Sequence, residues 1–268
     1  MSGTVIRTEP AAGIVQLTLN RPARLNAMSY ELLSDLHAEL DLIKADHAAR
    51  VVVITGEGRG YCAGLDLAEG AAVPGTEDEG RIQAGMATQQ YIASLVPKLR
   101  GLRQPVISAV NGPAAGGGLA LALASDVRLA AASAKFNVAF VRIGLSGCDI
   151  GVSWLLPRLI GASAAFELLL TGRIIDAEEA LRLKLVSRVV PDGEVVDAAL
   201  EVAEEIANNS PTGVWMTKEV MWSQLEVGSL QAGIDLENRT QIMTSQTADM
   251  QEAIAAFLQK RKPSFRNG

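Results

Sequence analysis

Short hydrophobic segments with the spacing of strands and helices follow one another along the first half of the chain. Residues 14–20, IVQLTLN, alternate between apolar and polar side chains as a half-buried strand does. Residues 51–55, VVVIT, are apolar almost throughout, which is typical of a strand buried on both faces. Between them, Ser29 can cap a helix whose apolar residues recur at helical spacing: Leu32, Leu33, Leu36, Leu40 and Ile43. This stretch is therefore predicted to form strand, helix and strand.

The order strand, glycine-rich loop and helix occurs twice. It occurs first at 51–66 and again at 106–124, where Pro105 opens the strand and three consecutive glycines precede an apolar run. A further helix is predicted over 82–102, between the two units. Repeated alternation of strands and helices favours an α/β fold.

The pattern becomes helical from Pro191 to the end of the chain. Asparagine, proline and glycine residues interrupt it, which predicts four helices, over 193–208, 211–226, 229–244 and 247–262. We therefore divide the chain into an α/β core over 1–190 and a helical region over 191–268. A helical region attached to an α/β core suggests a packing or assembly element.

Composition narrows the class of protein. The chain has 268 residues, 49% of them apolar, and a net charge of −6, which describes a compact protein and argues against nucleic acid or an anionic membrane as its partner. No apolar run approaches the ~20 residues of a membrane helix. Cys62 and Cys148 make no disulfide framework, and His37 and His47 make no metal-ligand cluster. We expect a cytoplasmic protein without a metal.

The two glycine-rich loops are the strongest candidates for chemistry. They are CAGLDL at 62–67 and AAGGGLAL at 114–121. Glycine lets a ligand approach the backbone closely, and a loop that enters a helix leaves free N–H groups at the positive end of the helix dipole. If the loops converge, one carbonyl oxygen could accept from an N–H of each, which would be an oxyanion hole. The alternative is that the glycines only permit tight packing of helix against strand.

The spacing of the glycines does not fit the common nucleotide-binding motifs. A dinucleotide fingerprint, G-x-G-x-x-G, starting at Gly56 or Gly58 would place its third glycine on Tyr61 or Ala63. No lysine follows a glycine run as it does in a P-loop.

Five segments in this order resemble the crotonase, or enoyl-CoA hydratase/isomerase, superfamily. They are LNRPARLNAMS, VVVITGEGRGYCAGLDL, PVISAVNGPAAGGGLALALASDVRLAA, LPRLIGASAAFELLLTGRIIDAEEALRLKLVSRVV and the tail AFLQKRKPSF. The resemblance covers nearly the whole chain. It implies an α/β spiral of β-β-α turns followed by a helical trimerisation region, and a homotrimer or a dimer of trimers.

The resemblance also implies a substrate and the residues that bind it. Family members bind acyl-CoA thioesters and stabilise an enolate, so coenzyme A enters as part of the substrate and no cofactor is bound permanently. The matching oxyanion donors are the backbone N–H groups of Leu65 and Gly117. The positions that match the coenzyme A site are Ala23, Arg24, Leu25, Ala63, Asp66, Leu67, Phe257 and Lys260. Lys260 has the alternative of being a solvated basic helix end.

The acids of the usual hydratase are missing. The family's two glutamates match Ala120 and Phe140, which cannot transfer a proton. Asp149 matches, with one extra residue in the alignment, an aspartate of the dienoyl-CoA isomerases. Its alternative is to cap a helix that begins near Ile150. The acids of the loop over the site are further candidates: Glu69, Glu77, Asp78 and Glu79.

Three functions remain open. The first is double-bond isomerisation in an unsaturated acyl-CoA, with Asp149 moving the proton, because one base can remove and return it. The second is an atypical enoyl-CoA hydratase, or a ring-opening or thioester hydrolase, in which Asp149 orients water or attacks carbon. The third is a coenzyme A ester-binding protein without catalysis.

Overall fold

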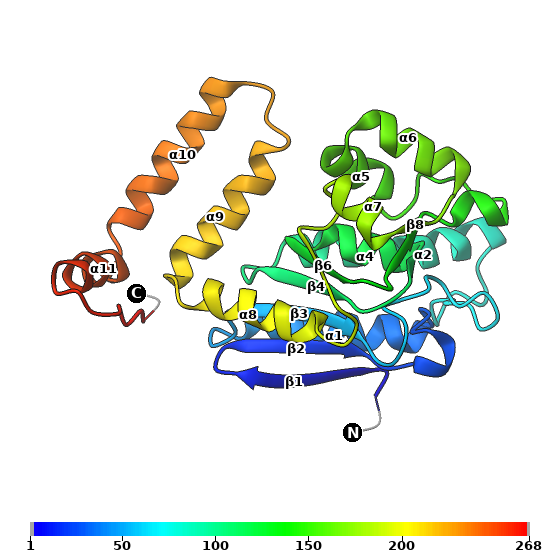
Figure 1. Ribbon diagram of the computed structural model, residues 1–268. Coiled ribbons are helices and arrows are strands. Elements are labelled where there is room, and N and C mark those ends of the chain that lie inside the picture. The colour runs from blue at the N-terminus through cyan, green and yellow to red at the C-terminus, as the bar shows by residue number, and fades with distance from the viewer. Residues whose placement is uncertain (1–2, 267–268) are drawn as a thin grey trace.

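A six-stranded sheet forms the centre of the molecule. The structure is a computed structural model that describes residues 3–266 (Figure 1). The strands lie in the order β1-β2-β3-β4-β6-β9; β1 is antiparallel to β2, and the other neighbours are parallel. Their bounds are β1 Val5–Ala11, β2 Ile14–Leu19, β3 Val51–Gly56, β4 Val106–Val110, β6 Val127–Ala131 and β9 Arg188–Val190. A smaller sheet joins β5 Ala114–Ala115, β7 Lys135–Asn137 and β8 Ile175–Asp176.

Helices cover both faces of the six-stranded sheet. Val51 and Val53 of β3 pack with α8 on one face, and Val52 and Ile54 pack on the other face with α1 and α4. Successive side chains of a strand point to opposite faces, so the apolar run 51–55 supplies two cores. The helices are α1 Tyr30–Ala45, α2 Arg81–Ala93, α3 Leu95–Arg100, α4 Gly117–Ala124, α5 Val152–Ile160, α6 Ala162–Thr171, α7 Ala177–Arg182, α8 Val195–Ala207, α9 Pro211–Gln224, α10 Leu230–Ser245 and α11 Ala248–Leu258, with 3-10 turns at Pro22–Arg24 and Phe140–Ile143.

The expected α/β fold is confirmed, and two local expectations need correction. Ser29 caps α1 as predicted, accepting the Leu32 N–H at 3.3 Å. The helix predicted over 82–102 is instead two helices, α2 and α3, that meet at Ser94. Pro97 explains the break, because its ring has no N–H and collides with the carbonyl one turn earlier. The second correction is that no helix follows the first glycine-rich loop: residues 62–80 contain none, and the next helix, α2, begins at Arg81. The edge strand β1 was not anticipated from the sequence.

The last three helices extend away from the sheet. In Figure 1, α9 and α10 lie side by side and α11 follows at their far end. α8 differs from them, since it packs against β3, β4 and β6. Many large apolar side chains of the extended helices are exposed, including Leu230, Ile242, Met243, Phe257 and Leu258. This surface is available for association with other chains.

Asp126 anchors the second half of α9 to the sheet. Its carboxylate accepts hydrogen bonds from the Val106 N–H and the Trp222 indole, each at 2.7 Å, and pairs with Lys218 at 2.8 Å. The guanidinium of Arg100 lies 4.2 Å from the ring of Trp222 and adds a cation–π contact. Asp126 is therefore a structural residue that links α9 to β4.

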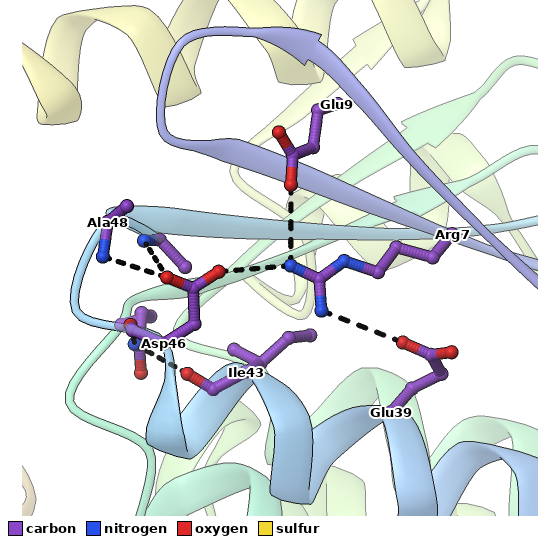
Figure 2. A network of polar contacts seen from close by, with 8 residues as sticks. Arg7, Glu9, Glu39, Ile43, Asp46 and Ala48 are labelled. Atoms are coloured by element: carbon purple, nitrogen blue, oxygen red, sulfur yellow. Dashed lines mark hydrogen bonds and ion pairs between the residues drawn. The ribbon is translucent and has the colours of Figure 1, made fainter.

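An ionic network at the opposite edge ties β1 to the end of α1 (Figure 2). Arg7 lies between three carboxylates and is 3.1 Å from Asp46, 3.4 Å from Glu9 and 3.8 Å from Glu39. The second Asp46 oxygen accepts the Ala48 N–H at 2.8 Å. The Ala48 hydrogen bond is the main reason why the pKa of Asp46 is lowered; partial burial opposes the shift, and the Arg7 hydrogen bond reinforces it.

No helix within residues 3–266 is long and apolar enough to cross a bilayer. Across the same residues, the side chains of His, Cys, Asp and Glu form no cluster of three or more that could hold a metal ion.

We predict that Asp46→Asn lowers the free energy of unfolding at pH 7 by about 1 kcal/mol. The variant loses the ion pair with Arg7 and the negative charge that accepts the Ala48 N–H. A carboxyl group with a lowered folded pKa stabilises above its ordinary value, here 3.8, and loses that effect as the pH falls through the folded pKa. The difference between variant and wild type should therefore shrink below pH 3.8. Urea unfolding at pH 7 and pH 3 measures it.

Glu9→Gln is the matched control, because Glu9 is the more exposed partner of Arg7. It should change the free energy of unfolding by less than about 0.5 kcal/mol. Equal effects of the two variants at pH 7 would contradict the role given to Asp46.

Candidate active site

The two glycine-rich loops are in direct backbone contact. The Cys62 carbonyl accepts the Ala115 N–H at 3.0 Å. A Cβ on Gly118 would lie 2.0 Å from that same carbonyl oxygen, and a Cβ on Gly64 would lie 2.8 Å from the Ala115 oxygen. Gly64 and Gly118 are therefore required for packing, as the structural interpretation proposed. The close packing also brings the N–H groups of the two loops together.

Two neighbouring N–H groups have no partner. The backbone groups on either side of the Leu65 N–H are already hydrogen-bonded. The Gly64 carbonyl accepts the Met28 N–H at 2.7 Å, and the Asp66 N–H donates to the Met28 carbonyl at 2.9 Å. Within residues 3–266, neither the Leu65 N–H nor the Gly117 N–H donates to another protein group. A Cβ on Gly64 would be 3.3 Å from the Gly117 nitrogen, so the loops present both donors in one region.

The helix that follows strengthens the second donor. Gly117 is the first residue of α4, so its N–H is at the positive end of the helix dipole. The preceding Gly116 has φ +51° and ψ −116°, a conformation that side chains disfavour. Such an arrangement can stabilise an oxygen that gains negative charge.

Apolar residues surround the turn at Gly116. The Ala120 N–H donates to the Gly116 carbonyl at 3.0 Å, and a Cβ on Gly116 would be 3.4 Å from the Phe140 ring. Both Ala120 and Phe140 are buried. The two positions that match the hydratase glutamates thus flank the triple glycine, but neither carries an acid.

Asp149 is half-buried and lies on the segment that faces the triple glycine. Its Oδ1 accepts the N–H of Ile150 at 2.8 Å and also the side-chain amide of Gln89, a residue of α2. A helix does begin near Ile150, since α5 starts at Val152, but its cap is Gly151, which makes no side-chain cap hydrogen bond. Asp149 therefore does not cap that helix, and Gln89 was missed by the sequence analysis.

A strained residue joins Asp149 to the triple glycine. Ile150 has φ +44°, which a β-branched residue rarely adopts. Its Cδ1 lies 3.5 Å from where a Cβ on Gly117 would be. Backbone strain of this kind is concentrated at functional sites, where the surrounding packing maintains it.

Cys62 lies beside these groups but is not available as a nucleophile. It is fully buried, and burial raises the pKa of its thiol to about 12. The thiol stays protonated at neutral pH, so Cys62 is a packing residue.

The loop matched to coenzyme A lies next to the first glycine loop. The Ala63 N–H donates to the Leu25 carbonyl at 3.0 Å, which places Ala23, Arg24 and Leu25 beside Ala63. Leu25 and Asn26 both have left-handed backbones, with φ 49° and 56°. The buried Asn26 amide maintains this turn by donating to the Gly60 carbonyl at 2.7 Å and accepting the Arg21 N–H at 2.8 Å.

The Asp66 carboxylate is used within the protein. It is buried, and it accepts from Arg21 at 3.1 Å and from the Ala68 and Glu69 N–H groups at 3.1 and 3.2 Å. Burial opposes ionisation, but the hydrogen bonds from Glu69, Ala68 and Arg21 outweigh it and lower the pKa of Asp66.

The loop contains two arginines, and they differ in whether their charge is paired with a carboxylate. Arg21 pairs with Asp66 and with Glu69 of the loop. Arg24 is exposed and, among residues 3–266, pairs with no side chain. Among the described residues, Arg24 is thus the unpaired cation of this loop. Leu67, which follows Asp66, is also exposed.

Phe257 and Lys260 are not brought to this site within one chain. They lie at the end of α11, across the molecule from α2 and α4 (Figure 1). Phe257 is 82% exposed. Contact with coenzyme A through these residues requires the site of another subunit.

Known proteins resemble the chain over almost its full length. The profile of the family described as "Enoyl-CoA hydratase/isomerase" matches residues 9–268. A "Probable enoyl-CoA hydratase" of Mycobacterium bovis is 43% identical over 97% of this chain and 92% of that protein. The "1,2-epoxyphenylacetyl-CoA isomerase" of Escherichia coli is 39% identical over 94% of this chain and 95% of that protein.

The fold also matches a solved structure. The crystal structure of a probable enoyl-CoA hydratase/isomerase from Mycobacterium abscessus has a TM-score of 0.92 and is 38% identical, with 99% of each chain covered.

We predict that Gly118→Ala lowers the free energy of unfolding by about 3 kcal/mol or more, because its Cβ would overlap the buried Cys62 carbonyl. Gly85→Ala is the matched control, since Gly85 is also helical and a Cβ there meets nothing within 4 Å. The free energy of unfolding of this control variant should rise by up to about 1 kcal/mol, because alanine has a higher helix propensity than glycine. Urea unfolding compares the two, and a Gly118→Ala protein as stable as wild type would contradict the loop contact.

Proposed function

The chain belongs to the enoyl-CoA hydratase/isomerase family, and from this premise we propose that it moves a double bond within an unsaturated acyl-CoA. The observation that carries the proposal is the single carboxylate, Asp149, on the segment that contacts Gly117. Both hydratase glutamate positions hold apolar residues, Ala120 and Phe140. Isomerisation needs only one base, whereas the usual hydration uses two acids to hold and deliver water.

The thioester carbonyl oxygen is stabilised by the Leu65 and Gly117 N–H groups in this proposal. Neither donor has a partner among residues 3–266, and the second is at the start of α4. They strengthen their hydrogen bonds as negative charge develops on the oxygen, so they favour the enolate over the thioester.

Asp149 transfers the proton. Its carboxylate removes a proton from a carbon of the acyl chain, and the electron pair of that C–H bond passes into the enolate. The double bond shifts, and the same carboxyl group returns the proton to a different carbon. The mass of the substrate is unchanged, and no cofactor is consumed.

Coenzyme A binds along the two adjacent loops in this proposal. Arg24, the unpaired cation, makes a charge-assisted hydrogen bond to a phosphate, while Ala23, Leu25, Ala63 and Leu67 line the nucleotide and pantetheine. Asp66 does not contact coenzyme A in this proposal. Its ion pair with Arg21 holds the loop that carries Arg24 in place.

The protein acts as a homotrimer or a dimer of trimers in this proposal, with association through the helical region over 191–268. The exposed apolar side chains of α10 and α11 support it, and Phe257 and Lys260 would then reach the coenzyme A of a neighbouring subunit. We expect light scattering at micromolar concentration to give a multiple of three chains. A monomer would contradict the assembly.

Hydration is the second candidate. The Mycobacterium bovis relative, 43% identical, is named as a hydratase. Asp149 Oδ2 accepts no hydrogen bond from the described protein residues, so it can orient a water. Ring opening or thioester hydrolysis would use the same carboxylate. The Escherichia coli relative, in contrast, is named as an isomerase of 1,2-epoxyphenylacetyl-CoA.

We predict that wild-type protein changes the absorbance of a 3-enoyl- or dienoyl-CoA without changing its mass. A panel of 2-enoyl-, 3-enoyl- and dienoyl-CoA esters, with products resolved by mass spectrometry, tests this. Asp149→Asn should lower turnover by about 100-fold or more through loss of the base. The acyl-CoA should still bind, because the asparagine oxygen can accept the Ile150 N–H as Oδ1 does.

Two results would count against this proposal. A gain of one water in mass would identify hydration in place of isomerisation. Near-normal turnover of a folded Asp149→Asn variant would exclude Asp149 as the base and direct the search to Glu69, Glu77, Asp78 and Glu79.

A further inference from the structure

We infer that Gln89 is a positioning residue that holds the Asp149 carboxylate in its reactive orientation. The inference rests on the proposed role of Asp149. Gln89 is on α2, 60 residues before Asp149 in the chain, and its side-chain amide donates to Asp149 Oδ1. The contact joins α2 to the segment that faces the triple glycine.

Both donors to Asp149 reach the same oxygen. The Ile150 N–H donates to Oδ1 at 2.8 Å, and the Gln89 amide donates to Oδ1 as well. Over residues 3–266, Oδ2 accepts from no protein group. One hydrogen bond to Oδ1 leaves the carboxylate free to turn about it, whereas two from different directions fix its plane. Oδ2 is then the oxygen that removes and returns the proton.

The amide is suited to this task because it is a neutral donor. A lysine or arginine at the same place would pair with the carboxylate and reduce its basicity, while a carboxylate would repel it. The glutamine orients Oδ1 and holds no proton that the reaction could consume.

The helix that carries Gln89 is attached to the core close by. Tyr91, two residues later, stacks on Tyr30 with ring centroids 5.6 Å apart, and its carbonyl is 3.2 Å from His37 Nε2. Ile92 is buried. These contacts with α1 fix the helix, while the Gln89 side chain itself is exposed and contributes little to packing.

The test is the kinetics of Gln89→Met, which keeps the length of the side chain and removes its donor. We expect kcat to fall about tenfold, the effect of losing one hydrogen bond to a charged group, with KM within about twofold. Gln90→Met is the matched control, because Gln90 is the exposed neighbour on the same helix and its side chain makes no hydrogen bond in the described structure. It should leave both constants unchanged.

A second variant separates orientation from packing. Gln89→Glu has the same shape but places a carboxylate against Asp149, so at pH 8 it should lower kcat at least as much as Gln89→Met. A residue that only fills space would tolerate this isosteric change.

A double-variant cycle completes the test. In the Asp149→Asn background there is no base to position, so adding Gln89→Met should lower kcat no further. The inference would be overturned if the reductions in kcat caused by the two variants multiplied in the double variant. It would also be overturned if Gln89→Met had the kcat of wild type. If Asp149→Asn alone retained turnover, the proposed function would fail instead, which distinguishes the two failures.

Discussion

The backbone contact between residues 62–67 and 114–121 is the constraint on which the site depends. The Cys62 carbonyl fills the space where Gly118 would carry a Cβ, and a Cβ on Gly64 would also be too close to the Ala115 carbonyl oxygen. Any side chain at either glycine would separate the loops. Tight packing and an oxyanion site are therefore not competing explanations of these glycines, because the packing is what brings the two free N–H groups together.

The rest of the site is arranged around this contact by residues that have no chemical role. Asn26 holds a left-handed turn in the loop matched to coenzyme A, and Arg21 links that loop to the first glycine loop through Asp66. Arg21 pairs with Asp66 and Glu69, whereas Arg24 pairs with no carboxylate among the described residues. In the proposed function, Arg24 is therefore the arginine of this loop that binds a phosphate.

The segment that carries Asp149 has a strained backbone at the next residue, Ile150. Ile150 adopts a left-handed backbone, which costs about 1–3 kcal/mol for a residue of this type. Its side chain packs against the core beside Gly117, and that packing offsets the strain. Asp149 directly precedes this residue, and Gln89 of α2 supplies the second hydrogen bond to its carboxylate. In the proposed function, the reduction from two acids to one favours proton transfer within the substrate over addition of water.

The sequence by itself determined the strands at 14–20 and 51–55, the capped helix after Ser29 and the helix that begins within the triple glycine. These elements follow from the order and spacing of neighbouring residues, which set local conformation directly. The family followed from the resemblance of whole segments. The break before Pro97 could also have been predicted, because proline has no N–H to donate within a helix. It was missed because only the periodicity of apolar residues was considered. Only the tertiary structure could place Gln89 on Asp149, Arg21 on Asp66 and α11 away from the site of its own chain. Contacts between residues so far apart depend on how helices and sheet pack, and no local pattern encodes that.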